Sequence, residues 1–209
     1  MTAPKRFASL NLRKKNMILE AAYREFCGVP YSSVRISSFI KSAGISRASF
    51  YLYFKDKEDL YRCMIYGLAE EVREGYLQCL QEQKGNFYRA VLATINLMES
   101  YGRREVYVDV YRKMMSEKLC CSIIIDVWKQ FHQSGLTADF IEACYQERNK
   151  GRYGDLNRDQ FTYAMELYTN ILERFLMMLA LEYPDVEKLK RSMESQLMIV
   201  ERAMLQMAA

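Results

Sequence analysis

The stretch RISSFIKSAGISRASFYLYF, residues 35–54, decides the fold of this chain. Its pattern predicts a helix over about 36–42, a tight turn and a second helix over about 47–53, which together form a helix-turn-helix. Gly44 supplies the left-handed backbone conformation that ends the first helix, and Ser46 is expected to cap the second. The two helices are expected to be locked together by the apolar residues Ile40, Ala43, Ile45 and Phe50.

The rest of the 209 residues has helical periodicity, with only nine Gly and three Pro. Further helices are expected over about 12–27, 57–83, 87–100, 104–117, 120–133, 137–150, 158–182 and 185–207. Asp56 is the expected N-cap of the helix that begins at Lys57. Val106, Val108 and Val110 alternate as in a strand, but no second strand pattern exists to pair with them. The chain is therefore predicted to be all-α.

The charge is divided between the two ends of the chain. Residues 1–62 carry 12 Lys and Arg against 5 Asp and Glu, whereas residues 63–209 carry 18 against 21. A basic segment on a mildly acidic body is typical of a nucleic-acid-binding module joined to a separate domain, although a solvated basic tail is the alternative. We expect an N-terminal helix-turn-helix domain over 1–62, with its motif at 35–54, and a C-terminal helical domain over 63–209.

Composition favours a cytoplasmic, non-enzymatic protein. The longest apolar run, Phe175–Leu181, is too short to span a membrane, and no classical export signal is present. With one histidine, His132, and no C-x-x-C pair, no metal site or cofactor is expected. Neither a catalytic nucleophile and base pair nor a phosphate-binding glycine loop stands out, which disfavours an enzyme. The cysteines at 27, 63, 79, 120, 121 and 144 are expected to be reduced thiols, with a redox sensor at Cys120 and Cys121 as the alternative.

Four segments resemble the TetR family of bacterial transcriptional regulators: Ile18–Phe26, Ala43–Ser46, Phe50–Phe54 and Lys57–Leu60. The resemblance covers about residues 13–62. It implies a three-helix DNA-binding domain followed by a helical ligand-binding and dimerisation domain. Arg35 departs from the family, which commonly has Ser or Thr there, so Ser32, Ser33 or Ser37 would have to cap the first motif helix.

The geometry of a helix-turn-helix suggests DNA roles for individual residues. Arg47 would pair with a guanine in the major groove, and Tyr51 and Tyr53 would donate to phosphates. Lys57 would add a charge for phosphate at the start of the long helix. The alternatives are packing for the two tyrosines and solvated charge for Lys57. The expected DNA-binding residues are Arg35, Ser37, Ser46, Arg47, Ala48, Ser49, Tyr51, Leu52, Tyr53 and Lys57.

The body is rich in Tyr and Met, which suits an apolar or aromatic effector, although most such residues are ordinary core. The candidate effector-binding residues are Tyr101, Tyr107, Tyr111, Met114, Trp128, Phe131 and Tyr145. Two apolar seams run along the last two helices, and the family resemblance implies that these helices form a dimer interface; packing within one subunit is the alternative. The seam residues are Phe161, Met165, Tyr168, Leu172, Phe175, Leu179, Leu189, Met193, Leu197, Val200 and Met204.

Together these features predict a DNA-binding transcriptional repressor. It would bind a palindromic double-stranded operator as a homodimer, and a small molecule would release it by changing the separation of the two reading helices. A second hypothesis is a TetR-like DNA-binding protein whose body binds a protein partner. No membrane partner is expected.

Overall fold

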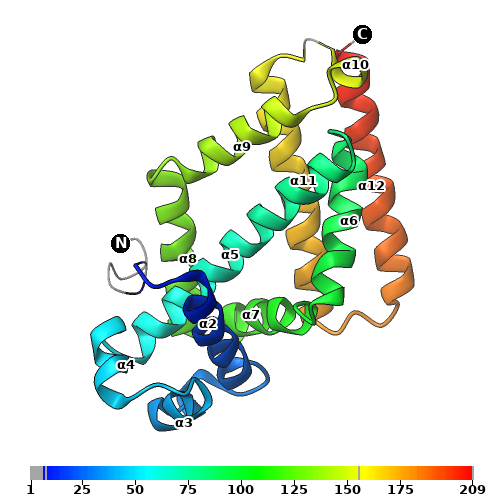
Figure 1. The fold of residues 1–209 in the computed structure, drawn as a ribbon. Helices are drawn as coiled ribbons and strands as arrows, with labels where there is room; N and C mark the ends of the chain where they lie inside the picture. Colours follow the sequence, from blue (N-terminus) through cyan, green and yellow to red (C-terminus); the bar gives the residue numbers. More distant parts are fainter. Residues whose placement is uncertain (1–6, 8, 155, 209) are drawn as a thin grey trace. The chain divides into compact units, whose positions relative to one another are not determined.

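The computed structural model describes Phe7, residues 9–154 and residues 156–208, and it places helices throughout this part of the chain (Figure 1). The elements are α2 (Leu12–Phe26), a 3₁₀ turn (Tyr31–Ser33), α3 (Ile36–Ser42), α4 (Arg47–Tyr53), α5 (Lys57–Glu82), α6 (Phe87–Ser100), α7 (Arg104–Ser116), α8 (Lys118–Gln133), α9 (Leu136–Glu147), α10 (Lys150–Tyr153), α11 (Arg158–Ala180) and α12 (Val186–Met207). The described residues include no strand, so the all-α prediction is confirmed, including the helix through Val106, Val108 and Val110.

One predicted helix is divided. The helix expected over 137–150 ends at Glu147, and a separate short helix begins at Lys150. The break lies at Asn149, whose side chain caps α10 and whose backbone amide donates to the carbonyl oxygen of Gly85 at 3.2 Å. This tertiary hydrogen bond cannot be inferred from the local sequence.

By packing, the chain forms two compact units, Met1–Glu71 with Arg112–Ser134 and Val72–Tyr111 with Gly135–Ala209. We call them the reading unit and the body unit. The predicted ranges 1–62 and 63–209 are a functional division and stay a prediction. The packing nevertheless adds the end of α7 and all of α8 to the unit that carries the helix-turn-helix.

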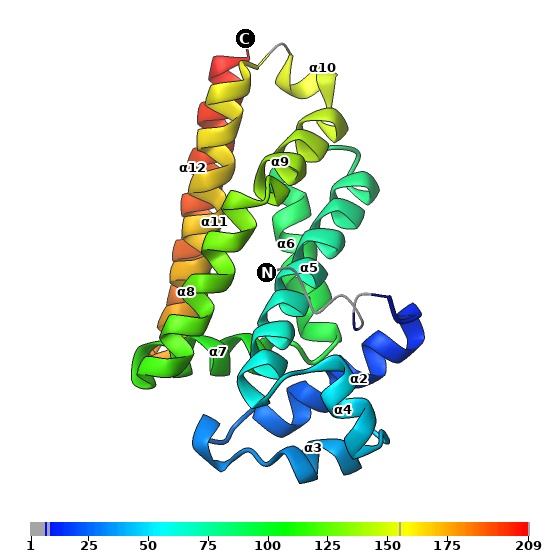
Figure 2. The same ribbon diagram turned by 90° about the vertical axis from the view of Figure 1, so that its left-hand side faces the viewer.

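The body unit is organised by α11 and α12, which pack along each other and lie side by side in both views (Figures 1 and 2). Helix α9 contacts α11, and α6 contacts α12. The core between these helices contains aromatic residues such as Phe87, Tyr153 and Phe161. None of the helices in the described ranges has the length and apolar character that crossing a membrane requires.

Candidate nucleic-acid interface

The turn between α3 and α4 is closed by the residues that the sequence nominated. Gly44 has a φ of +61°, and the amide of Ile45 donates to the carbonyl oxygen of Ile40 at 3.2 Å. The hydroxyl oxygen of Ser46 caps α4 by accepting a hydrogen bond from the amide of Ser49 at 3.0 Å. The predicted turn glycine and cap are confirmed, and they fix where α4 begins.

An aromatic core holds α4 against α3. Phe39, Phe50 and Phe54 are buried. The ring centroids of Phe39 and Phe50 lie 5.9 Å apart, and those of Phe50 and Phe54 lie 5.5 Å apart. Because one side of the short helix α4 is committed to this core, its other side faces solvent.

The solvent-facing side of α4 carries Arg47, Ala48, Tyr51 and Leu52. The guanidinium carbon of Arg47 lies 5.8 Å from the ring centroid of Tyr51, within the range of a cation–π contact. Ser49 is half-buried, and its hydroxyl lies 2.9 Å from that of Ser46. The structure therefore gathers these predicted residues on one accessible surface, and their contacts with DNA stay a prediction.

The start of α3 differs from expectation. Arg35 occupies the N-cap position, and no side chain caps the helix, so the predicted capping by Ser32, Ser33 or Ser37 is wrong. Arg35 and Ser37 are both exposed and accessible to a ligand.

Lys57 holds the segment that precedes α3. Its ammonium group donates to the carbonyl oxygens of Tyr31 at 2.8 Å, Val34 at 3.1 Å and Ser32 at 3.5 Å. It also lies 4.4 Å from the ring centroid of Tyr31. These three carbonyl partners match the three N–H donors of the group. These contacts position the segment before α3, and the phosphate contact of Lys57 stays a prediction.

Tyr53 is largely buried, and its contact with a phosphate stays a prediction. Only 7% of it is exposed, and the ammonium group of Lys14 lies 5.4 Å from its ring centroid. Packing, the alternative considered for this tyrosine, describes the observed position, whereas Tyr51 is 50% exposed.

Residues distant in sequence support the reading unit, and local patterns could not reveal them. The buried ammonium group of Lys113 donates to the carbonyl oxygen of Phe26 at 2.8 Å. The carboxylate of Glu117 accepts from the amide of Tyr31 at 3.2 Å. Both contacts tie the region of α7 and α8 to the chain between α2 and α3, across 86 or more residues of sequence.

The seven candidate effector residues do not form one group. Met114, Trp128 and Phe131 belong to the reading unit, whereas Tyr101, Tyr107, Tyr111 and Tyr145 belong to the body unit. Their exposure ranges from 62% for Tyr101 to 7% for Phe131. Their role in effector binding stays a prediction.

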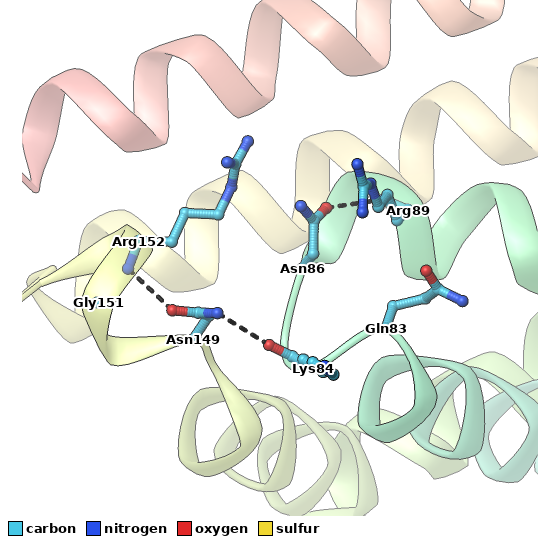
Figure 3. Close-up of a pocket in the computed structure, with 7 residues that line it drawn as sticks. All are labelled: Gln83, Lys84, Asn86, Arg89, Asn149, Gly151 and Arg152. Carbon is cyan, nitrogen blue, oxygen red and sulfur yellow. Dashed lines mark hydrogen bonds between the residues drawn. The ribbon is translucent and has the colours of Figure 1, made fainter.

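A recess of about 480 Å³ lies in the body unit (Figure 3). It is lined by Gln83, Lys84, Asn86, Arg89, Asn149, Gly151 and Arg152, and none of the candidate effector residues is among them. The side chain of Asn149 joins the two chain segments of its wall by donating to the carbonyl oxygen of Lys84 at 3.1 Å. This wall is polar, unlike the aromatic lining that the sequence predicted.

A buried carboxylate joins three helices of the body unit, and one of its tyrosine partners extends the network to a fourth. Glu201 of α12 accepts hydrogen bonds from the guanidinium of Arg152 at 2.7 and 2.9 Å and from the hydroxyls of Tyr153 at 2.8 Å and Tyr168 at 3.1 Å. The Tyr153 hydroxyl in turn accepts from the amide of Phe87 at 3.1 Å. No sequence signal marked Glu201, because its partners come from two other helices, α10 and α11.

The apolar seams of α11 and α12 face the interior of the chain. Nine of their eleven residues are buried, and Leu172 and Phe175 are half-buried. These nine residues pack within one subunit, as the alternative hypothesis expected. Their assignment to a dimer interface is untested by a single chain. The outward faces of the same helices carry Tyr163, Leu167, Met198 and Ile199, which are 40–66% exposed.

The six cysteines are free thiols in this structure. Burial raises the pKa of Cys63 and of Cys144 to about 12. Burial, assisted by the Glu117 carboxylate, raises the pKa of Cys120 to about 11. Reactive thiols have lowered pKa values, so we expect these three thiols to be unreactive.

Comparison with known proteins finds relatives of the segment that contains the helix-turn-helix. Residues 18–64 match the sequence profile of "Bacterial regulatory proteins, tetR family". The chain is 32% identical over 66 residues to the HTH-type transcriptional regulator YdgC of Bacillus subtilis (strain 168) and 23% identical over 95 residues to YhgD of the same organism. These matches cover 32% and 44% of this chain, and they span about a third and a half of the two relatives, 34% and 50%.

Among solved structures, the chain is similar to a TetR family transcriptional regulator from Chloroflexus aurantiacus J-10-fl, with a TM-score of 0.41 and 22% identity over 95% of this chain and 96% of that one. The profile match contains the whole of α3 and α4, together with Gly44, Ser46 and the start of α5. Residues 18–64, which carry the helix-turn-helix, therefore match the tetR family of bacterial regulatory proteins.

Proposed function

We propose that this protein is a transcriptional repressor that binds a palindromic operator as a homodimer and is released by a small-molecule effector. The observation that carries the proposal is the outward face of α4, where Arg47 and Tyr51 stand exposed on a helix fixed by a buried aromatic core. A fixed helix with its side chains free to reach base edges is what major-groove reading requires.

The outward faces of α11 and α12 support the homodimer. Tyr163 and Leu167 are 62% and 52% exposed on α11, and Ile199 is 66% exposed on α12. We propose these residues, with Met198, as the surface between the two copies, in place of the buried seams. A dimer places two α4 helices on one duplex, where half-sites are about 34–36 Å apart.

The long-range contacts of Lys113 and Glu117 support regulation through the reading unit. A ligand that displaced the end of α7 would strain the chain at Phe26 and Tyr31, which leads into α3. A change of a few ångströms in the separation of the two α4 helices is enough to mismatch the half-sites.

The second candidate, a DNA-binding protein whose partner is another protein, is favoured by exposed apolar residues on α8. Ile125 and Trp128 are 39% and 37% exposed and lie one turn apart. Trp128 would then contact a protein surface instead of an effector.

Selection of bound sequences from a pool of random duplex DNA tests the function. We expect an inverted repeat to be enriched, and affinity for it to fall with salt by about 0.9 log units per phosphate contact for each log unit of salt. Failure to enrich any sequence would contradict the proposal. Release of the selected duplex by planar aromatic compounds would separate a small-molecule effector from a protein partner.

A further inference from the structure

The exposed face of α4 is chemically mixed. Of its four exposed residues, Arg47 and Tyr51 carry polar groups, while Ala48 and Leu52 are apolar. Leu52 is 47% exposed. Ala48 and Leu52 are four residues apart and therefore adjacent on one side of the helix. An apolar pair thus lies beside the only cationic side chain of α4.

The other hydroxyl groups at α4 are less exposed or bonded to each other. Ser46 caps α4, and its hydroxyl shares a hydrogen bond with that of Ser49 at 2.9 Å. Tyr53 is buried. Within α4 the exposed residues are Arg47, Tyr51 and the pair Ala48 and Leu52, so this pair is the apolar part of the surface that the helix offers to a ligand.

The major groove has one apolar feature that matches this pair. Guanine, cytosine and adenine present hydrogen-bond donors and acceptors there, whereas thymine adds a C5-methyl group. Desolvating Ala48 and Leu52 against polar base edges would gain nothing, but contact with a methyl group buries apolar surface on both sides. Arg47, on the same face, suits the O6 and N7 atoms of a neighbouring guanine.

We infer that Ala48 and Leu52 read thymine methyl groups and thereby set the sequence preference beside the base that Arg47 reads. The inference rests on the proposed DNA binding and adds to it the chemical group that is recognised. Each half-site should contain thymines whose methyl groups contribute to affinity. At about 0.8 kcal/mol for a buried methyl-sized group, loss of one such methyl should weaken binding about fourfold.

Deoxyuridine tests this directly, because it differs from thymidine only by the missing methyl group. In the duplex obtained by selection, each thymidine of one half-site is replaced singly by deoxyuridine. We expect about fourfold weaker binding at the positions under Ala48 and Leu52 and no change elsewhere. Replacement of the same T·A pair by 5-methylcytosine·G should bind more tightly than replacement by C·G, because the methyl group is restored.

Protein variants assign each methyl group to its reader. For Leu52→Ala and Ala48→Gly, the ratio of affinities for the thymidine and deoxyuridine duplexes is measured with one protein preparation, so that partial unfolding or a general loss of affinity cancels. We expect the ratio to fall from about four to about one at the position that each residue reads. Tyr51→Phe, which keeps both apolar side chains, should weaken binding to both duplexes and keep the ratio.

If the affinity is unchanged when deoxyuridine replaces any one of the thymidines, the inference is wrong. The proposed DNA binding would be unaffected by that result. If Leu52→Ala leaves the thymidine to deoxyuridine affinity ratio unchanged, Leu52 does not read a methyl group. The same result for Ala48→Gly would exclude Ala48. If no duplex is selected at all, the proposed function itself fails, which is a different result from either of these.

Discussion

The ammonium group of Lys57, the first residue of α5, donates to the carbonyl oxygen of Tyr31 at 2.8 Å and lies 4.4 Å from the ring centroid of the same residue. Through the additional bond to Val34 at 3.1 Å, one side chain holds both ends of the 3₁₀ turn that precedes α3. Because α3 has no capping side chain, we expect the placement of its first turn to depend on this lysine.

Replacing Lys57 with Met should therefore destabilise the protein and weaken DNA binding without changing the salt dependence. Loss of hydrogen bonds from a charged group to these partly buried carbonyls should cost about 1.5–3 kcal/mol, measured as the free energy of unfolding in urea. Lys55→Met, at an exposed lysine, is the matched control and should have little effect on stability. A salt slope lower by about 0.9 per subunit in Lys57→Met would instead assign this residue to a phosphate.

Arg47 should behave in the opposite way, because it is exposed on α4 and makes no contact that folding needs. Arg47→Ala should cost about 1–3 kcal/mol per half-site on the preferred operator and much less on a duplex altered at the base pair that Arg47 reads. Tyr51→Phe should weaken binding to all sequences by a similar factor. The measurement is a matrix of both variants against single-base operator variants at fixed salt. Equal losses for Arg47→Ala on every duplex would make it a phosphate contact.

The sequence predicts α3 and α4 well because the first and last residues of these helices depend on local signals. Gly44 and Ser46 act within a few residues of their own positions, and α3 and α4 begin and end where expected. The partners of Lys57 and Lys113 lie 23–26 and 87 residues away. Such pairings depend on how helices pack, and helical periodicity carries no information about them.

The same reasoning explains the seams of α11 and α12. Periodicity shows that a helix has an apolar face, but it does not say whether that face meets its own chain or a second copy. Leu197 is buried within the chain, whereas Ile199 is exposed, although both belong to an apolar stretch of α12. Only the packed structure separates them.

The buried thiols predict a loss of stability at alkaline pH. The pKa values of Cys63 and Cys144 are raised to about 12 in the folded chain from an ordinary value of 9.0. Their contribution is complete below pH 9 and is lost as pH rises toward 12, because the unfolded chain releases these protons first. Replacing both with Ala should reduce the fall in unfolding free energy between pH 9 and pH 10 by about 2 kcal/mol, measured by urea titration. An unchanged slope would contradict this.

The Glu201 carboxylate should be more important to folding than any one of its donors. Glu201→Leu leaves the hydroxyls of Tyr153 and Tyr168 without their acceptor, which should lower the free energy of unfolding by about 2–4 kcal/mol. Tyr168→Phe is the matched comparison, since it removes one donor and leaves the bonds from Arg152 and Tyr153. It should cost about 1 kcal/mol. If urea unfolding shows the smaller loss for Glu201→Leu, the carboxylate does not organise this part of the body.

Substitutions at exposed and at buried residues of α12 should have different effects, the first on dimerisation and the second on folding. Ile199→Glu combined with Leu167→Glu places charges on the proposed surface between copies, so sedimentation at micromolar concentration should detect monomers with unchanged helical circular dichroism. Leu197→Glu buries a charge in a fully enclosed position and should unfold the body unit instead. Val186→Glu, at an exposed apolar residue on another side of α12, is the matched control and should leave the dimer intact. Folded monomers from Leu197→Glu, together with a dimer that tolerates the charges at Ile199 and Leu167, would return the interface to the buried seams.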